Sequence, residues 1–164
     1  MKTEAQVLAE MLDYNRKQTI GYFNKISPDQ YTRSFEVNGK TLNSPLWIIG
    51  HLAVTENYLC LRSTGAEIVR FSWAKQFGLG AALPSESEYP AASEILEIFH
   101  AVHEASMRKI MSLSDEELLQ VNASGMKFGG DDSVRTIVRH AIAHEGQHAG
   151  HLGWLCKLNG VKTI

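Results

Sequence analysis

Apolar residues recur three and four positions apart over four long stretches of the chain, a spacing typical of amphipathic helices. These stretches cover residues 3 to 25, Leu46 to Leu61, Ala92 to about Met111, and Ser133 to about Leu158. On the first stretch, the predicted apolar face consists of Val7, Leu8, Met11, Leu12, Asn15, Thr19, Tyr22, Phe23 and Ile26. The pattern therefore predicts four long helices.

Several helix ends carry recognisable capping signals. Ser44 can accept hydrogen bonds from the free amides of the second helix, and Pro45 suits its first turn. Asn159 and Gly160 are expected to end the last helix. The segment SDEELLQ (residues 114–120) predicts one further capped helical turn.

The segments between these helices show little regular pattern. Residues 66 to 90 contain two glycines and two prolines, which predicts a long loop with one helical turn. FEVNGK predicts a short extended excursion around Asn38 and Gly39, which is too little for a sheet. We therefore expect an all-α fold: one domain, residues 1–164, forming a four-helix bundle with a long loop between helices 2 and 3.

The composition excludes several classes of protein. With 44% hydrophobic and 21% charged residues, the chain is typical of globular proteins. A net charge of −2 and the lack of a basic run argue against nucleic-acid binding. No stretch approaches the ~20 apolar residues that cross a bilayer, and acidic residues interrupt the segment where a signal peptide would lie. Cys60 and Cys156 are expected to be packing residues, so we predict a cytoplasmic protein.

The last predicted helix contains an unusual histidine row in RHAIAHEGQHAGHLGWL (residues 139–155). On a helical wheel, His140, His144, His148 and His151 fall within about 80° of one another. A single histidine on such a face is usually a hydrogen-bonded core residue, whereas four half-buried imidazoles need several partners. A divalent metal satisfies two or three at once, and His144 and His148 have the i, i+4 spacing that grips one ion.

A third ligand must come from elsewhere in the chain, and His51 in PLWIIGHLAVTENYL is the best candidate. It lies two turns into the second helix, among core-like neighbours. The adjacent Gly50 lowers helix propensity, which suits the close approach of another backbone or a ligand. The predicted metal ligands are therefore His51, His144 and His148. His151, His140 and Trp47 are assigned to the pocket or to the layer behind the ligands, while His100 and His103 are left outside the metal shell.

The sequence HEGQH also matches the H-E-x-x-H motif of zinc proteases, in which Glu145 would activate a metal-bound water. Its context differs from theirs, because Gly146 lies inside the motif and the extended pattern is out of phase. Glu145 is retained as a candidate catalytic residue, and a metal-dependent hydrolase as the less favoured alternative.

Two phrases, SPLWIIGHLAVTENYL and IVRHAIAHEGQHAGHLGWLCKLNG, resemble the DinB-like superfamily. That resemblance implies a four-helix bundle in which one histidine on the second helix and an H-x-x-x-H pair on the last hold a metal. It assigns the metal to His51, His144 and His148. Many relatives have Gln at the position of His151.

The resemblance also implies an activity. Characterised relatives include S-transferases and isomerases that use bacillithiol, mycothiol or similar low-molecular-weight thiols. We therefore expect a metal-dependent thiol S-transferase that acts on small molecules, with one divalent ion, zinc or nickel. The alternative is a non-catalytic metal-bearing module for small-molecule binding or stress response. Because bundles of this size commonly pack across an apolar helix face, a homodimer is expected.

Overall fold

Capping side chains begin three of the long helices at the predicted places. In the computed structural model, which describes residues 1–163, Thr3 accepts a hydrogen bond from the backbone of Gln6 at the start of α1. Ser44 and Ser133 cap α2 and α5 in the same way. The long helices are α1 (Glu4–Phe23), α2 (Pro45–Glu56), α3 (Ala92–Met111) and α5 (Val134–Leu158).

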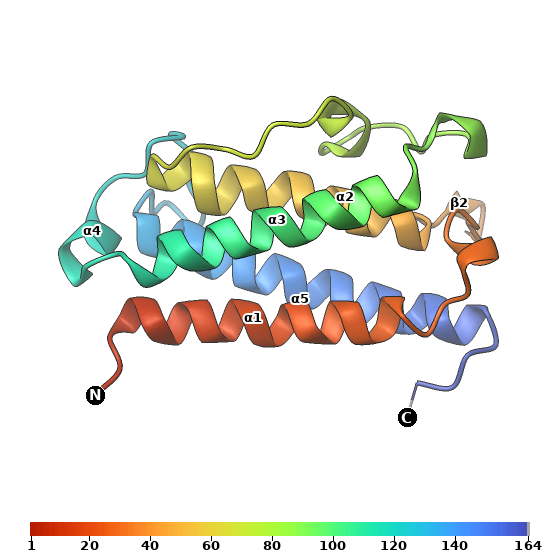
Figure 1. Ribbon diagram of the computed structural model, residues 1–164, viewed down its shortest axis with the longest axis horizontal. Helices are drawn as coiled ribbons and strands as arrows, with labels where there is room; N and C mark the ends of the chain where they lie inside the picture. The colour runs from red at the N-terminus through yellow and green to blue at the C-terminus, as the bar shows by residue number, and fades with distance from the viewer. Residues whose placement is uncertain (164) are drawn as a thin grey trace.

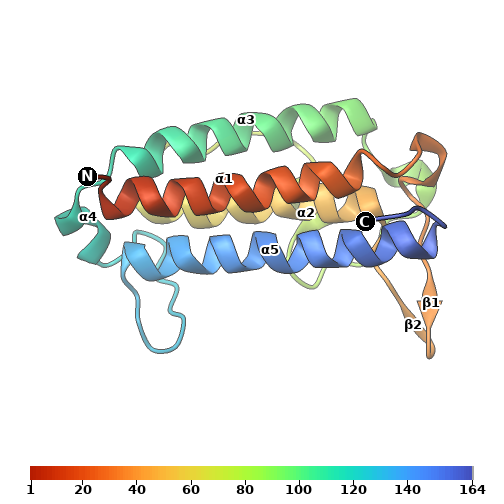
Figure 2. The ribbon, with the colours of Figure 1, turned by 90° about the horizontal axis from the view of Figure 1, so that it is seen from below.

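The four long helices form a bundle in which α1 and α5 run in one direction along the axis and α2 and α3 in the other, and the prediction of an all-α bundle is confirmed (Figures 1 and 2). Each packs against two neighbours, so that α1 contacts α3 and α5, and α2 contacts the same two helices. Along the bundle axis α2 and α5 run in opposite directions (Figure 1). The short helix α4 (Asp115–Leu119) is the predicted turn, capped by Ser114.

The buried face of α1 differs from the predicted one. Val7 and Met11 are exposed, whereas Arg16 is buried. The residues of α1 that face the core are Ala5, Leu8, Ala9, Leu12, Arg16, Thr19 and Phe23. An arginine therefore occupies the middle of an otherwise apolar stripe, where its charge requires partners.

The C-terminal end of the second helix changes its winding before it stops. A π-helical turn, η2 (Asn57–Leu61), follows α2 directly, and the 3₁₀ turn η3 (Arg62–Thr64) follows that. Gly65 then adopts φ +72°, the left-handed conformation that ends helices. Together these elements extend to the predicted end of the second helix.

The long loop between α2 and α3 is held against the bundle by aromatic side chains. It contains two 3₁₀ turns, η4 (Ala74–Phe77) and η5 (Glu86–Glu88), where one helical turn was predicted. Trp73 and Phe77 are buried in the core. The Trp73 indole Nε1 donates to Glu94 on α3 at 2.9 Å, which ties the loop to that helix.

A minimal hairpin precedes α2. Strands β1 (Glu36–Val37) and β2 (Lys40–Thr41) pair antiparallel around Asn38 and Gly39, which have φ of 50° and 69°. Another short segment, η1 (Pro28–Gln30), turns the chain after α1. In residues 1–163, no helix combines the length and apolar character that a bilayer span requires.

Candidate metal centre

His51 is held in a defined orientation by the long loop. Its Nδ1 lies 2.7 Å from the backbone carbonyl oxygen of Phe77. Because a carbonyl can only accept, Nδ1 carries the proton of the neutral ring, and Nε2 keeps a free lone pair. A histidine ligand whose other nitrogen donates to a carbonyl is the usual arrangement at metal sites.

Gly50 makes this contact possible. A Cβ atom built on Gly50 would lie 2.5 Å from the Phe77 ring, a distance that real Cβ atoms do not tolerate. A close approach was predicted at this glycine, but the approaching group is an aromatic side chain rather than a backbone or a ligand. On another side of His51, the Trp47 ring stacks at 4.8 Å between centroids with an interplanar angle of 10°. Trp47 thus lies directly against the imidazole.

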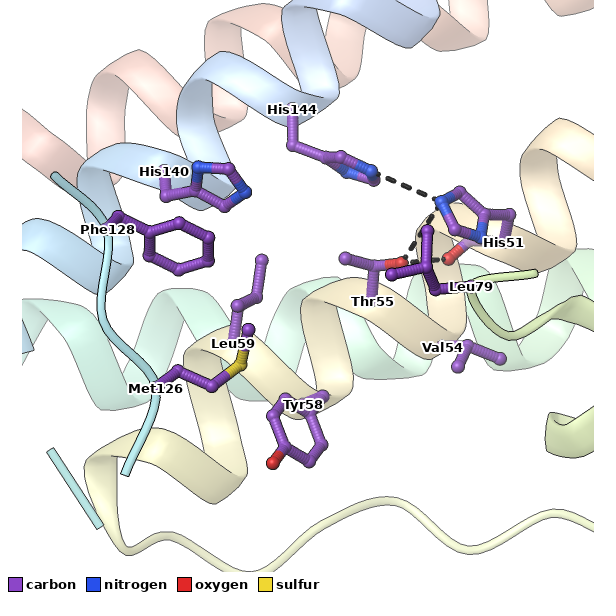
Figure 3. Close-up of a pocket in the computed structure, with 10 residues that line it drawn as sticks. All are labelled: His51, Val54, Thr55, Tyr58, Leu59, Leu79, Met126, Phe128, His140 and His144. Carbon is purple, nitrogen blue, oxygen red and sulfur yellow. Dashed lines mark hydrogen bonds between the residues drawn. The ribbon is translucent and has the colours of Figure 1, made fainter. Parts of the chain in front are cut away.

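His144 and His148 face His51 from α5, one helical turn apart. The three residues each offer a ring nitrogen, and these nitrogens all lie within 4.8 Å of one another. The Nε2 atoms of His51 and His144 are 3.2 Å apart (Figure 3). Since three imidazole nitrogens at this spacing are a common donor set for divalent ions, this group, here called the histidine triad, could hold a metal ion.

The environment keeps the triad neutral. Burial lowers the pKa of His51, against the opposing effect of its hydrogen bond to Phe77. Burial, reinforced by the neighbouring histidines, lowers the pKa of His144 to about 4 and that of His148 to about 3. All three rings are therefore unprotonated near pH 7, which is the form that donates a lone pair to a metal.

The other two histidines of the row lie on opposite sides of the triad. His151 is exposed, and its Nδ1 lies 3.3 Å from Nδ1 of His148. His140 is half-buried and stacks on the Phe128 ring with centroids 3.6 Å apart. Neither residue belongs to the group of three whose nitrogens lie close together. Both lie at the edge of that group, where a bound molecule could touch them.

Glu145 faces away from this row, into the bundle core. Its carboxylate accepts hydrogen bonds from Arg16 at 3.0 Å and from Thr19 at 2.6 Å, both on α1. The residue is 2% exposed. Burial raises the pKa of Glu145, although the Arg16 guanidinium acts in the opposite direction. Its oxygens are therefore committed to a contact between α1 and α5.

Arg16 connects Glu145 to a larger buried network. It also pairs with Glu56 of α2 and donates to the Phe99 carbonyl oxygen at 3.1 Å, with its guanidinium 3.5 Å above the Phe99 ring. His103 Nδ1 lies 3.0 Å from the Glu56 carboxylate. Burial alone would raise the pKa of Glu56, but Arg16 and His103 hold it below its ordinary value. We call Arg16, Glu56, Glu145, Thr19 and His103 the buried ion network.

The buried ion network was not predicted from the sequence, although one signal for it was present. Arg16 lies four residues after Leu12 and three before Thr19, on the apolar stripe of α1. A charged residue at such a position requires an opposite charge from another helix. Glu56 and Glu145 were the acidic residues to consider, because each lies inside an apolar stretch.

Two hollows flank the triad. One is a cavity of about 540 Å³ whose wall includes His51, His144 and His140 (Figure 3). The other, of about 350 Å³, includes His151 and Trp154 and lies beside the hairpin. The triad is thus accessible to small molecules rather than sealed in the core.

Comparison with known proteins identifies one family. The model of the DinB superfamily matches residues 11–152 of this chain. The matched range begins in α1 and includes His51, His144 and His148. No curated protein matches the chain.

Proposed function

Because the chain belongs to the DinB superfamily, we propose that it is a metal-dependent thiol S-transferase that acts on small molecules. One observation carries the proposal: His51, His144 and His148 offer three neutral imidazole nitrogens within 4.8 Å of one another, beside a cavity. These three residues would hold one divalent ion, which we propose to be zinc or nickel, two of the metals that an all-imidazole donor set suits.

The metal would supply positive charge at the place where a thiol binds. A divalent ion held by three neutral imidazoles keeps its full charge, which favours the thiolate over the thiol at neutral pH. The chain itself does the positioning. Phe77 and Trp47 hold His51, and burial keeps His144 and His148 unprotonated.

The proposed reaction joins the thiol to an electrophilic carbon. The thiolate sulfur forms a bond to that carbon, and the bond from the carbon to its leaving group breaks. The leaving group departs with the electron pair, while the thiol proton passes to solvent. The nucleophile comes from a low-molecular-weight thiol, because both cysteines of the protein are buried and burial raises the pKa of Cys60 and of Cys156.

The decisive experiment has two stages. Elemental analysis of the purified protein should find one divalent ion per chain, and His144→Ala should lose it. His100→Ala, a histidine exposed on α3, serves as the matched control and should retain the ion. A wild-type protein that binds no stoichiometric metal after incubation with zinc or nickel would refute the proposed site.

The second stage measures turnover. The metal-loaded protein is assayed with 1-chloro-2,4-dinitrobenzene and a panel of low-molecular-weight thiols, and we expect thioether formation that His144→Ala abolishes. Metal binding without turnover for any thiol and electrophile would favour the non-catalytic binding module instead.

Glu145 remains a candidate general base for the alternative hydrolytic reaction, and its contacts make a test simple. Glu145→Gln would retain the metal in either case, because Glu145 lies outside the triad. Loss of activity without loss of metal or of thermal stability would support a catalytic role. We expect instead that stability falls, because the hydrogen bonds from Arg16 and Thr19 weaken.

The expected homodimer is part of the same proposal. Sedimentation velocity at micromolar protein should give a single species of twice the chain mass, and a monomer would contradict it.

A further inference from the structure

The two hollows lie on opposite sides of the histidine triad, along the same pair of antiparallel helices. On α2, Ile48 lines the hollow beside the hairpin, His51 belongs to the triad, and Val54 lines the larger cavity. On α5 the order is reversed, with His140 in the larger cavity and Leu155 in the hollow. The triad therefore stands between two separate spaces.

The larger space, here called the apolar cavity, has no charged side chain in its lining. Val54 and Leu59 come from α2 and the turn that follows it, and Met126 and Phe128 come from the loop before α5 (Figure 3). Its polar groups are the Thr55 and Tyr58 hydroxyls and the imidazoles. In the metal-free protein, a charged group placed there would lose hydration without gaining a countercharge. At about 540 Å³, the cavity is within the range of roughly 300–1,000 Å³ that holds small ligands.

The smaller space, here called the hairpin hollow, combines an apolar floor of Leu42, Ile48 and Leu155 with polar groups at its edge. Thr41 and Asn43 offer a hydroxyl and an amide, and His151 offers an imidazole. Trp154, which is 67% exposed, adds a flat wall. The Nδ1 atom of His151 lies 3.3 Å from that of His148, so a molecule in this hollow lies beside the triad. These groups suit a molecule rich in hydrogen-bonding atoms.

We infer that the protein binds two molecules side by side, an uncharged apolar electrophile in the apolar cavity and a polar thiol in the hairpin hollow. The inference rests on the proposed function and adds which substrate occupies which side. The thiol sulfur then meets the electrophilic carbon at the triad, between the two spaces. The sulfur–carbon bond forms, the leaving group takes the electron pair of the broken bond, and the thiol proton goes to solvent.

The first test needs no activity. N-phenyl-1-naphthylamine is neutral, and 8-anilino-1-naphthalenesulfonate is the same fluorophore with one sulfonate. After the metal has been removed with a chelator, we expect the protein to bind the neutral probe at least about tenfold more tightly, a difference of about 1.4 kcal/mol. Equal affinity, or preference for the sulfonate, would overturn the assignment of the apolar cavity.

Substitutions then locate the neutral probe. Met126→Glu places a carboxylate in the cavity wall and should weaken the neutral probe about tenfold or more. Leu79→Glu does the same at the rim from a residue that is 99% exposed, so its folding is not at risk. Leu119→Glu, on α4 and outside both spaces, is the matched control and should leave the affinity unchanged. An unchanged affinity in Leu79→Glu and in folded Met126→Glu would overturn the inference.

Two-substrate kinetics test the division between the spaces. Leu79→Glu should raise the KM for the electrophile severalfold and leave the KM for the thiol within about twofold. Asn43→Ala, an exposed residue of the hairpin hollow, should do the reverse. If each variant changes both KM values together, the two molecules do not occupy separate spaces.

The two readouts separate this inference from the proposed function. Absence of turnover with every thiol would refute the transferase, while the two fluorophores would still report whether the cavity takes uncharged ligands. Turnover in which each variant changes the KM for the electrophile and the KM for the thiol equally would refute this inference alone. Turnover without a preference for the neutral probe would do the same.

Discussion

His144 and Glu145 are neighbours in the sequence, yet their side chains belong to two regions with opposite properties. Glu145 points into the buried ion network, where Arg16 and Thr19 occupy its oxygens. His144 points toward α2, where its Nε2 meets the Nε2 of His51 and a cavity opens beside it. One helix thus separates a closed polar cluster from an open one.

The two regions differ in whether their polar groups find partners within the chain. In the buried ion network, opposite charges and hydrogen bonds within the chain offset the cost of burial. In the histidine triad, three neutral rings bring their nitrogens together, with a contact of 3.2 Å between Nε2 of His51 and Nε2 of His144, and an added metal ion could bind all three. A residue of the first region therefore acts mainly on stability, and one of the second acts mainly on binding.

The largest expected effect comes from Arg16→Met. It leaves the Glu56 and Glu145 carboxylates buried without their cation, and breaking such a pair costs about 3–5 kcal/mol. Urea unfolding followed by circular dichroism measures the change. Arg62→Met, an exposed arginine, is the matched control and should stay within about 0.5 kcal/mol of wild type. A loss below about 1 kcal/mol for Arg16→Met would mean that the network contributes little.

Gly50→Ala should have the next largest effect. The added methyl group collides with the Phe77 ring, and overpacking of this kind costs about 1–3 kcal/mol. Because Phe77 also holds His51 through its carbonyl, zinc affinity should fall with stability. Competition with a chromophoric chelator measures the affinity.

Gly21→Ala is the control for this substitution. Gly21 lies in α1, and a Cβ atom added to it would meet nothing within 4 Å, so alanine should stabilise that helix by up to about 1 kcal/mol. If both alanine variants unfold at the same urea concentration as wild type, the contact between Gly50 and Phe77 does not matter.

Much of the fold was predictable because its signals are local. The caps at Ser44, Ser114 and Ser133 and the three-to-four spacing of apolar residues lie within each helix, and the helices form where these signals predict them. The predicted face of α1 was wrong in part, because it left out Arg16, which is buried, and included Val7 and Met11, which are exposed. Whether a charge is buried depends on partners from other helices, which no local pattern displays.

The candidate site likewise has one part that could be predicted from the sequence and one part that could not. The i, i+4 spacing of His144 and His148, together with the glycine before His51, indicated three ligands that the structure brings together. The Phe77 carbonyl was not predictable, because it comes from a loop 26 residues away whose path follows from tertiary packing. The cavity walls at Met126 and Phe128 come from another such loop.

His144→Ala should change the stability of the metal-free protein by less than about 1 kcal/mol, because the residue is half-buried and carries no buried charge. Its effect should appear when metal is added. Zinc at about a hundred times its dissociation constant should stabilise the wild type by about 2.7 kcal/mol and the variant by much less. Thermal melts with and without zinc measure both quantities, and equal zinc shifts would contradict a role for His144.

The smallest effect is expected for His151→Gln. The residue is exposed and lies outside the three whose nitrogens lie within 4.8 Å, so metal content and stability should stay at wild-type values. Elemental analysis and a thermal melt check this expectation. Loss of the ion would show that His151 is a fourth ligand.

The hydrogen bond from His51 to the Phe77 carbonyl has a kinetic consequence. The backbone of η4 holds the His51 ring in place, so the ring can turn away only after this hydrogen bond breaks. For an ion bound at the triad, we therefore expect the residence time of the ion and the hydrogen-exchange protection of η4 to rise and fall together.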